Sequence, residues 1–336
     1  MSCDASFCSE LRSKRRSNSG SGSGSGSKIG KFENPDSSSG SQKGGISIEN
    51  FIRFYMFVKL LGIGAFGVVN LMQHRHSGKS YAVKVIKKTK PNTDMNTRNE
   101  IELGMILDSQ YVCKVYSFYE DNNHFYIIME YLEGMDLFDF IKKNPQFFIN
   151  NPKIFWVVVK SILRGLAYLH SQGIAHMDIK PDNVFLLLDN QGNIFDVKLV
   201  DLGLSIDVNN KPKCFQGTGA YMGPEFFHLC WDTGLPADIW SLGMTMFAMI
   251  MGFVPFSSKL KDPERAQQKI FRKIEFLLSE KGFFNPFLKL SNDPSIRDMQ
   301  SIILSCFAIC PDKRPTVLQL LDYILSTGSS NAQNNP

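Results

Sequence analysis

Three polar residues that could act together in catalysis stand close together between two apolar runs. Asp178, Lys180 and Asn183 belong to "HMDIKPDN" (176–183), which follows "ILRGLAYLH" and precedes "VFLLL". An aspartate can accept a proton from a hydroxyl nucleophile, a lysine can neutralise a phosphoryl group in transfer, and an asparagine can offer an oxygen to a metal ion. The stretch therefore indicates chemistry on phosphate groups.

A second carboxylate follows at Asp201 in "LVDLG" (199–203), where a predicted hairpin ends. Mg²⁺ prefers carboxylate and phosphate oxygens, so Asp201 and Asn183 are candidate ligands of a nucleotide-bound Mg²⁺. Taken singly, each of these residues is more often structural than catalytic. Their order and spacing together favour the catalytic interpretation.

Three glycines, Gly62, Gly64 and Gly67, are spaced through "LGIGAFGVV" (61–69). Such a triplet also occurs by chance, or as a dinucleotide fingerprint at a strand-to-helix turn. Here the glycines lie between two predicted strands, and no helix follows them. A glycine loop between strands can instead fold over a triphosphate, with its backbone N–H groups facing the phosphate oxygens.

Lys84 ends "YAVK" (81–84) on the returning strand, in apolar surroundings. A buried lysine without an anionic partner is costly, so this side chain needs a carboxylate. Glu100, in the next predicted helix, is the expected partner. Glu102 is the runner-up, although it would point to another face of that helix.

The elements that must position these residues change in character along the chain. "FYMFVKLLGIG" and "VVNLMQHRHSGKSYAVKVIKK" predict strands, and a hairpin is expected around residues 121–123. Apolar spacing predicts a first helix over 96–108, and one later hairpin over 184–200. Further helices are expected at 136–143, 153–171, 237–251, 263–280 and 295–307. The pattern favours an α+β fold with two lobes.

With these motifs in order, the chain resembles the eukaryotic protein kinase family, serine/threonine branch, from about residue 55 to 325. "GPE" (223–225) stands where the family has "APE", and "DIWSLG" (238–243) and "KRPT" (313–316) match two later motifs. The resemblance implies a bilobal kinase fold, with a small β-rich N-lobe carrying one helix and a larger, mostly α-helical C-lobe. It also implies an ion pair between Glu225 and Arg314, and a catalytic loop anchored by Asp238. Some segments look nearest to the Aurora-like and AGC- or CAMK-like branches.

The resemblance also implies roles for single residues, with ATP and Mg²⁺ as cofactors. Asp178 is expected to be the catalytic base, assisted by Lys180 and Asn183, and Asn183 and Asp201 to hold Mg²⁺. Thr218, in "GTGAYMGPE", matches the threonine that the serine/threonine branch places near that base. Met129 is the expected gatekeeper before the hinge, Glu130 to Leu132, whose backbone is expected to contact adenine. Asp136 is placed to touch the ribose. The expected ATP-binding residues are Leu61, Gly62, Ile63, Gly64, Ala65, Phe66, Gly67, Val68, Val69, Ala82, Lys84, Glu100, Met129, Glu130, Tyr131, Leu132 and Asp136.

Two departures from the family pattern concern regulation. Met177 replaces the arginine that normally pairs with a phosphate on the activation loop. The segment 204–217 offers only Ser205 as an acceptor, and the usual phosphosite falls at Cys214. We therefore expect activity that does not depend on activation-loop phosphorylation, or that a partner controls. The alternative is that another basic residue of the loop, such as Lys211 or Lys213, replaces the arginine. A further departure, Leu202 in place of the usual phenylalanine, is expected to be a packing variant.

Other functions stay open beside this one. A pseudokinase scaffold that binds ATP without transferring phosphate is the main alternative, although no reacting group is missing. A small-molecule phosphotransferase would share the aspartate–asparagine spacing, and calcium regulation would need a separate chain because no EF-hand loop occurs. For protein substrates, acidic Asp136 and Asp182 predict a mild preference for basic residues near the target. A third position of this kind is Ala248, which carries no charge.

Bulk composition bounds the remaining expectations for the 336 residues. Hydrophobic residues make up 43%, and a net charge of +5 does not imply nucleic-acid binding. Residues 1–49, rich in serine and glycine, and 327–336 are expected to be disordered tails. The kinase domain is then expected over 50–326, with an N-lobe of about 50–131 and a C-lobe of about 132–326.

The location is expected to be intracellular and cytoplasmic, with the nucleus as an alternative. The seven cysteines are odd in number and form no CxxC pair, so a reducing compartment fits best, and Cys306 and Cys310 read as small core residues. The N-terminus lacks a signal-peptide pattern, and residue 2 is serine, which makes a lipid anchor a weak expectation. "IWSLGMTMFAMIMGFVPF" (239–256) predicts a buried core helix rather than a transmembrane segment.

Overall fold

The structure is a computed structural model that describes residues 51, 53–64, 67–88, 91–209, 217–227, 234–253, 272 and 293–330, without the side chains of 91–93, 295 and 327–330. These residues all fall in one compact unit, Ile46–Pro336. The predicted disordered segment 1–49 and nearly all of the predicted helix 263–280 lie outside the described residues.

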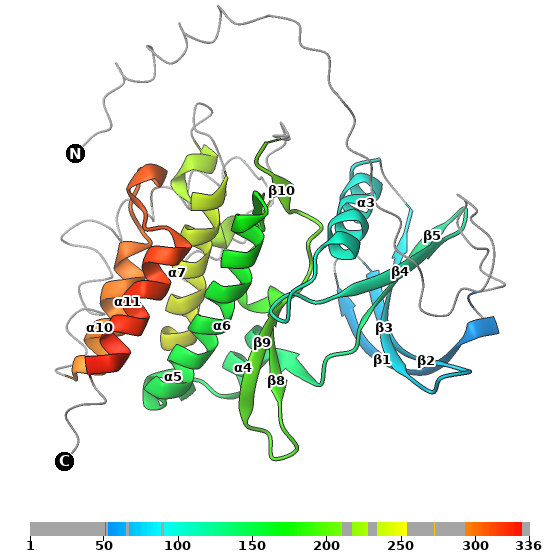
Figure 1. Cartoon of the computed structure of the whole chain (residues 1–336), viewed down its shortest axis with the longest axis horizontal. Helices are drawn as coiled ribbons and strands as arrows, with labels where there is room; N and C mark the ends of the chain where they lie inside the picture. Colours follow the sequence, from blue (N-terminus) through cyan, green and yellow to red (C-terminus); the bar gives the residue numbers. More distant parts are fainter. Residues whose placement is uncertain are drawn as a thin grey trace, which may run out of the picture. The chain divides into compact units, whose positions relative to one another are not determined.

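The N-lobe is built on a five-stranded antiparallel sheet in the order β1-β2-β3-β5-β4 (Figure 1). Its strands are β1 (Tyr55–Gly64), β2 (Gly67–His74), β3 (Ser80–Lys87), β4 (Val115–Glu120) and β5 (His124–Glu130), and the helix α3 (Pro91–Ile106) contacts β4. Side chains alternate between the two faces of a strand. On β5, Phe125 and Ile127 pack with Ile101 of α3, while Tyr126 and Ile128 join a separate cluster on the other face. This alternation explains why apolar strands lie at the centre of the sheet.

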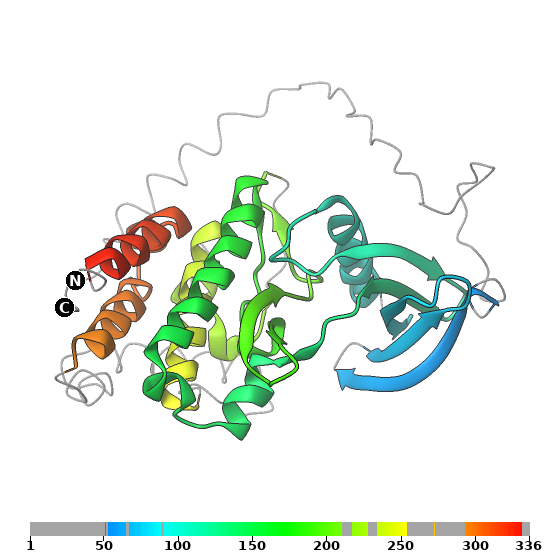
Figure 2. The same ribbon diagram turned by 60° about the horizontal axis from the view of Figure 1, so that its bottom comes forward.

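The C-lobe is built mainly from helices around one apolar core. Its helices are α4 (Leu137–Lys143), α5 (Phe147–Asn150), α6 (Pro152–Ser171), α7 (Leu235–Met251), α10 (Pro294–Ser305) and α11 (Val317–Ser330). α7 is buried almost all round, with Trp240 at its centre, as the sequence predicts for its part of 239–256. α10 packs against α7, and α11 packs against α6. In both views α10 and α11 lie on the side of the C-lobe that is away from the N-lobe (Figures 1 and 2).

Short strands and 3₁₀ turns of the C-lobe hold the loops that carry the motif residues. β6 (Gly134–Asp136), β8 (Val184–Leu188) and β9 (Ile194–Leu199) form a sheet in the order β6-β8-β9, and β7 (Ile174–Ala175) pairs with β10 (Ile206–Asp207). The 3₁₀ turns are η1 (Pro181–Asn183), η2 (Gly219–Tyr221), η3 (Pro224–Phe227) and η4 (Pro311–Lys313).

The predicted α+β, two-lobed fold is confirmed, and the helix ends differ in two instructive places. α3 begins at Pro91, ahead of the predicted 96, because a proline is favoured in the first turn although it adds nothing to the apolar pattern. α11 (Val317–Ser330) was not among the predicted helices, and it continues into the predicted tail 327–336 because a formed helix propagates beyond its last core contact.

Within the described residues, one helix is long and apolar enough to cross a membrane, namely α6 (Pro152–Ser171). Half of its apolar stretch is buried inside the protein, and the core helices of globular domains can have the same length and composition.

Candidate active site

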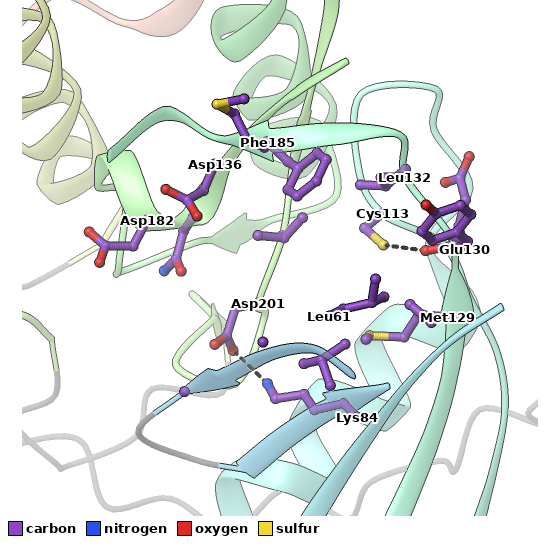
Figure 3. Close-up of a pocket in the computed structure, with 18 of the residues that line it drawn as sticks. Leu61, Lys84, Cys113, Met129, Glu130, Leu132, Asp136, Asp182, Phe185 and Asp201 are labelled. Carbon is purple, nitrogen blue, oxygen red and sulfur yellow. Dashed lines mark hydrogen bonds and ion pairs between the residues drawn. The ribbon is translucent and has the colours of Figure 1, made fainter. Parts of the chain in front are cut away.

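A cleft of about 640 Å³ lies between the two lobes, within the size range of small-molecule sites. Both lobes contribute to its lining: the glycine-bearing strands and α3 from one side, and β6, η1, β8 and the end of β9 from the other. Figure 3 shows side chains from both sides pointing into this space. The predicted site residues that line it are Leu61, Gly62, Ile63, Gly64, Gly67, Val69, Ala82, Lys84, Glu100, Met129, Glu130, Tyr131, Leu132, Asp136, Lys180, Asn183 and Asp201.

Three predicted ATP-binding residues are not placed at the cleft. Ala65 and Phe66 lie outside the described residues. Val68 belongs to β2 but does not line the cleft, whereas its neighbours Gly67 and Val69 do. Successive side chains of a strand point to opposite faces, so a continuous run of predicted contacts cannot hold along β2.

The three glycines of the loop meet different surroundings. A Cβ at Gly67 would collide with the carbonyl oxygen of Val85, so this position requires glycine for close packing of β2 on β3. At Gly62 nothing lies within 4 Å of a Cβ, and at Gly64 the nearest atom is 3.8 Å away. The first two glycines, Gly62 and Gly64, therefore leave open space around the loop.

Lys84 lies at the back of the cleft, where it contacts two carboxylates. Its Nζ is 2.8 Å from both carboxylate oxygens of Glu100 and 3.4 Å from Oδ1 of Asp201 (Figure 3). Burial acts to lower the pKa of Lys84, but the charges of Glu100 and Asp201 outweigh it and raise this pKa, so the ammonium stays charged. The predicted Lys84–Glu100 pair is confirmed, whereas Glu102 is exposed on α3.

Asp178 is buried and accepts hydrogen bonds at both carboxylate oxygens. Oδ1 accepts from the Thr218 hydroxyl at 2.7 Å and from the Thr218 N–H at 3.1 Å. Oδ2 accepts from Lys180 Nζ at 2.7 Å and from Asn183 Nδ2 at 2.9 Å. Lys180 Nζ also donates to the Thr218 hydroxyl at 2.7 Å. The carboxylate that is predicted to take a proton from a substrate hydroxyl therefore already accepts a hydrogen bond from the hydroxyl of Thr218.

The backbone of this loop is held by Asp238, which is fully buried at the start of α7. Its carboxylate accepts the N–H groups of His176 and Met177, each at 2.8 Å, and lies 2.8 Å from Nε2 of His170. Met177 has a φ of 67°, which is uncommon for a residue with a side chain and stays fixed only where its surroundings hold it. The predicted anchoring of the loop by Asp238 is confirmed.

Asn183 and Asp201 form a donor set that fits Mg²⁺. Asn183 Nδ2 donates both to the backbone oxygen of Asp178, at 2.8 Å, and to its carboxylate, which leaves Oδ1 as the amide's acceptor atom. Burial acts to raise the pKa of Asp201, but Lys84 and the Gly203 N–H outweigh it and lower that pKa. Among the described residues no cluster of three or more His, Cys, Asp or Glu could hold a metal, so phosphate oxygens would have to complete the coordination.

Further cleft residues were not assigned from the sequence. They lie mostly on strands beside the motifs and include Cys113, Val115, Met135, Phe185 and Leu199. Phe185 lies on β8 just after the turn that carries Asn183, and Leu199 ends β9 just before Asp201. This closeness in sequence to the motif residues was a signal that could have found both. Burial, aided by Glu130, raises the pKa of the Cys113 thiol to about 12.

The segment that follows Asp201 is held by contacts that need no phosphate. Met177 packs in a buried apolar cluster with Ala175, Met222, Phe226 and Ala237. Ser205 is buried, and its hydroxyl donates to the backbone oxygen of His176 at 3.3 Å. The proposed alternatives Lys211 and Lys213, and Cys214, lie outside the described residues.

One side chain of α3 reaches the same segment. Asn99, next to Glu100, donates from Nδ2 to the backbone oxygen of Ser205 at 2.7 Å and of Leu202 at 3.4 Å. The helix that supplies the partner of Lys84 is therefore tied to the backbone that follows Asp201.

The predicted Glu225–Arg314 pair is confirmed as a bidentate, fully buried ion pair. The two guanidinium nitrogens lie 2.7 and 2.6 Å from the two carboxylate oxygens, and the side chains are 0% and 1% exposed. Gly223, in the place of the family's alanine, has no Cβ that would collide with the Glu225 carboxylate.

Comparisons with known proteins agree with this architecture. A family model described as protein kinase domain matches residues 55–324. Among curated relatives, serine/threonine-protein kinase CG17528 of Drosophila melanogaster is 31% identical over 281 residues, covering 83% of this chain and 36% of that protein. Calcium-dependent protein kinase 4 of Plasmodium falciparum is 35% identical over 223 residues, covering 63% and 41%. The chain thus spans about two fifths or less of these relatives.

A solved structure is also similar to this one. The crystal structure of Rad53 1–466 in complex with AMP-PNP has a TM-score of 0.63 and 27% sequence identity, and the match covers 82% of this chain and 66% of that one.

Proposed function

The chain belongs to the protein kinase family, and we propose that it transfers the γ-phosphate of ATP to serine or threonine hydroxyls of proteins. The observation that carries the proposal is one cleft lined by Lys84, Asn183 and Asp201, with Asp178 hydrogen-bonded to Asn183 beside it. Phosphoryl transfer is achieved mainly by positioning and electrostatic stabilisation, and these groups supply both.

Each group has a task that follows from its contacts. Lys84, held by Glu100, would bind phosphate oxygens with its charged ammonium, and the open glycine positions would let the loop backbone approach them. Asn183 and Asp201 would hold Mg²⁺, which would supply positive charge against the phosphates. Asp178 would accept the proton of the substrate hydroxyl, while Lys180 stabilises the charge that develops on the transferred group.

Specificity for serine and threonine is supported by the contacts of Lys180 and Thr218. Lys180 bridges the Asp178 carboxylate and the Thr218 hydroxyl, each at 2.7 Å. This arrangement fixes Thr218 against the base at the place where a short aliphatic hydroxyl must enter, which favours serine and threonine over the longer tyrosine.

We propose that substrates carry basic residues near the target. Asp136 and Asp182 lie on the same side of the cleft (Figure 3). Burial raises the pKa of Asp136, and the neighbouring charges of Asp139 and Asp182 raise it further despite the N–H of Asp139. A bound cation would relieve this repulsion. On a peptide array, a preference for acidic or proline-directed targets would contradict the proposal.

We also propose that activity does not depend on phosphorylation of the segment 204–217. Met177 cannot pair with a phosphate, and the hydroxyl of Ser205 is buried and hydrogen-bonded. Phosphatase-treated protein should therefore keep its transfer activity. An enzyme that is inactive until phosphate is added within 204–217 would refute this proposal.

We also propose an intracellular, cytoplasmic location. The odd number of cysteines supports it, and Cys113, Cys306 and Cys310 are free thiols. Fractionation of cells with an antibody to this chain would test it, and recovery from the medium would contradict it.

Transfer of labelled phosphate from ATP to a mixture of proteins tests the main proposal. Asp178→Asn should reduce transfer by roughly 10²–10⁴-fold, the usual contribution of a general base, while ATP still binds. Asp189→Asn, at an exposed carboxylate of the β8–β9 turn, is the matched control and should keep full activity. ATP binding without transfer by the unmodified protein would instead favour the pseudokinase alternative.

A further inference from the structure

We infer that Lys198 is a positioning residue for the adenine base, because it holds the Glu130 carboxylate of the hinge against the floor of the cleft. The inference rests on the proposed function, since it concerns how the same cleft binds the nucleotide. Lys198 itself does not line the cleft, whereas Glu130 does. Its action would therefore pass through Glu130.

The contact between the two side chains is bidentate and partly buried. Lys198 Nζ lies 2.9 Å from Oε1 and 2.6 Å from Oε2 of Glu130, and the side chains are 13% and 27% exposed. Charge-assisted hydrogen bonds of this length are stronger than neutral ones, and partial burial reduces screening by solvent. The pair joins the end of β5, in the five-stranded sheet of the N-lobe, to β9, in the three-stranded sheet of the C-lobe.

All the polar groups of Glu130 are engaged, so its backbone has a defined place. Its N–H donates to the backbone oxygen of Lys114 at 2.9 Å, and its own carbonyl oxygen is 3.9 Å from the thiol of Cys113 (Figure 3). The carboxylate is held by Lys198. Main-chain groups of Glu130 to Leu132 are those expected to contact the base, so the position of this carboxylate affects the edge that the base would meet.

The register of the C-lobe sheet places Lys198 in one row with two residues of the cleft, Asp136 and Phe185. Asp136 pairs with Phe185 across β6 and β8, and Phe185 pairs with Lys198 across β8 and β9. Directly paired residues on neighbouring strands share one face of a sheet. Asp136 and Phe185 both line the cleft, and Lys198 is the next residue of the same row, just beyond the cleft lining. Its bond to Glu130 then sets the spacing between this row and the hinge.

This geometry predicts an effect limited to the base. Without the ammonium, Glu130 would lose its cation and keep only the Lys114 N–H, 3.5 Å from Oε2. The hinge would shift relative to Phe185, and ATP affinity would fall. A ligand without base or ribose would bind as before, because Lys84 and the metal ligands are untouched.

The test is a calorimetric titration of the full chain with ATP and Mg²⁺, and separately with tripolyphosphate and Mg²⁺. Lys198→Met should weaken ATP binding about tenfold, which corresponds to about 1.4 kcal/mol, and leave tripolyphosphate within about twofold. Lys198→Arg should restore most of the ATP affinity. Lys153→Met, at an exposed lysine of α6, is the matched control and should change neither ligand.

A second variant and a kinetic measurement guard against misfolding as the cause. Glu130→Gln should show the same loss for ATP, and the double variant should be no worse than either single one. In the transfer assay the KM for ATP should rise about tenfold, while kcat stays within about twofold.

Three outcomes would overturn the inference. Wild-type ATP affinity in Lys198→Met would do so, and so would an equal loss for ATP and tripolyphosphate, which would indicate general damage. If the unmodified protein binds tripolyphosphate but not ATP, or neither, then the proposed function itself fails, and the inference fails with it.

Discussion

Glu225→Gln removes one charge from the buried ion pair that fixes the end of the segment carrying Thr218. Arg314 donates to both oxygens of Glu225 and to the backbone oxygens of Pro236 and Ala308, and its guanidinium lies 5.0 Å from the centre of the Trp240 ring. A glutamine has nearly the same shape, but its NH₂ group would face a guanidinium N–H. The substitution therefore leaves a buried positive charge without its counter-charge.

The size of the effect follows from burial. Both side chains are essentially inaccessible, and breaking a buried ion pair by removing one partner costs about 3–5 kcal/mol. The total stability of a domain is about 5–15 kcal/mol, so this cost is a fifth of it or more. At roughly 2 °C per kcal/mol for a domain of this size, the melting temperature should fall by about 6–10 °C.

Thermal unfolding followed by circular dichroism measures this change, and the transfer assay at a temperature well below unfolding measures its consequence for activity. Activity should also fall, because Thr218, whose N–H and hydroxyl bind Asp178, precedes Glu225 on the same short segment. The double variant Glu225→Gln/Arg314→Met removes both charges and should recover part of the lost stability. A melting temperature within about 2 °C of the wild type in Glu225→Gln would refute the reasoning.

Three further predictions concern other parts of the domain. Ser205→Ala should cost about 1 kcal/mol of stability and leave the activity of phosphatase-treated protein within about twofold; an activity that needs a phosphate on Ser205 would contradict this. Burial acts to raise the pKa of Glu120, but Lys88 and Arg98, each 3.0 Å away, lower it below 4.5. Its stabilising contribution is therefore present above 4.5 and lost as the pH falls through the lowered pKa. Urea unfolding of Glu120→Gln should show a deficit of about 0.5 kcal/mol at pH 7 that vanishes in acid, below that lowered pKa. Because the pKa of Cys113 is about 12, iodoacetamide at about pH 8 should alkylate it only after unfolding, as peptide mass spectrometry can show; rapid labelling of the folded protein would contradict this.

The residues that the sequence predicts best are those whose chemistry leaves one sensible partner. A lysine in an apolar strand needs a carboxylate, and Lys84 finds it at Glu100 rather than at Glu102, as helix geometry favours. The contacts of Asp178 with Lys180 and Asn183 depend on one short loop, so their spacing alone brings them together. The strands and most helices follow from apolar periodicity in the same local way.

Residues whose position depends on sheet register were harder to predict. The partnership of Lys198 and Glu130 requires knowing that β9 pairs with β8 so that Lys198 faces the hinge, and a shift by one residue would turn it to the other side. Val68 was wrongly predicted to line the cleft, because the prediction treated the motif as a continuous run and ignored the alternation of side chains along β2. Helix ends were missed where polar residues extend a helix beyond its apolar face.

The contacts around Met177 suggest how the segment after Asp201 can stay ordered without a phosphate. An arginine–phosphate anchor is ionic, so it depends on a kinase and a phosphatase and weakens with salt. The anchor here combines an apolar cluster, the buried hydroxyl of Ser205 and the amide of Asn99, none of which carries a charge. Apolar burial and neutral hydrogen bonds respond little to ionic strength or to phosphatase. Because Asn99 also adjoins Glu100, the same uncharged contacts that order the segment keep α3 where Lys84 needs its carboxylate.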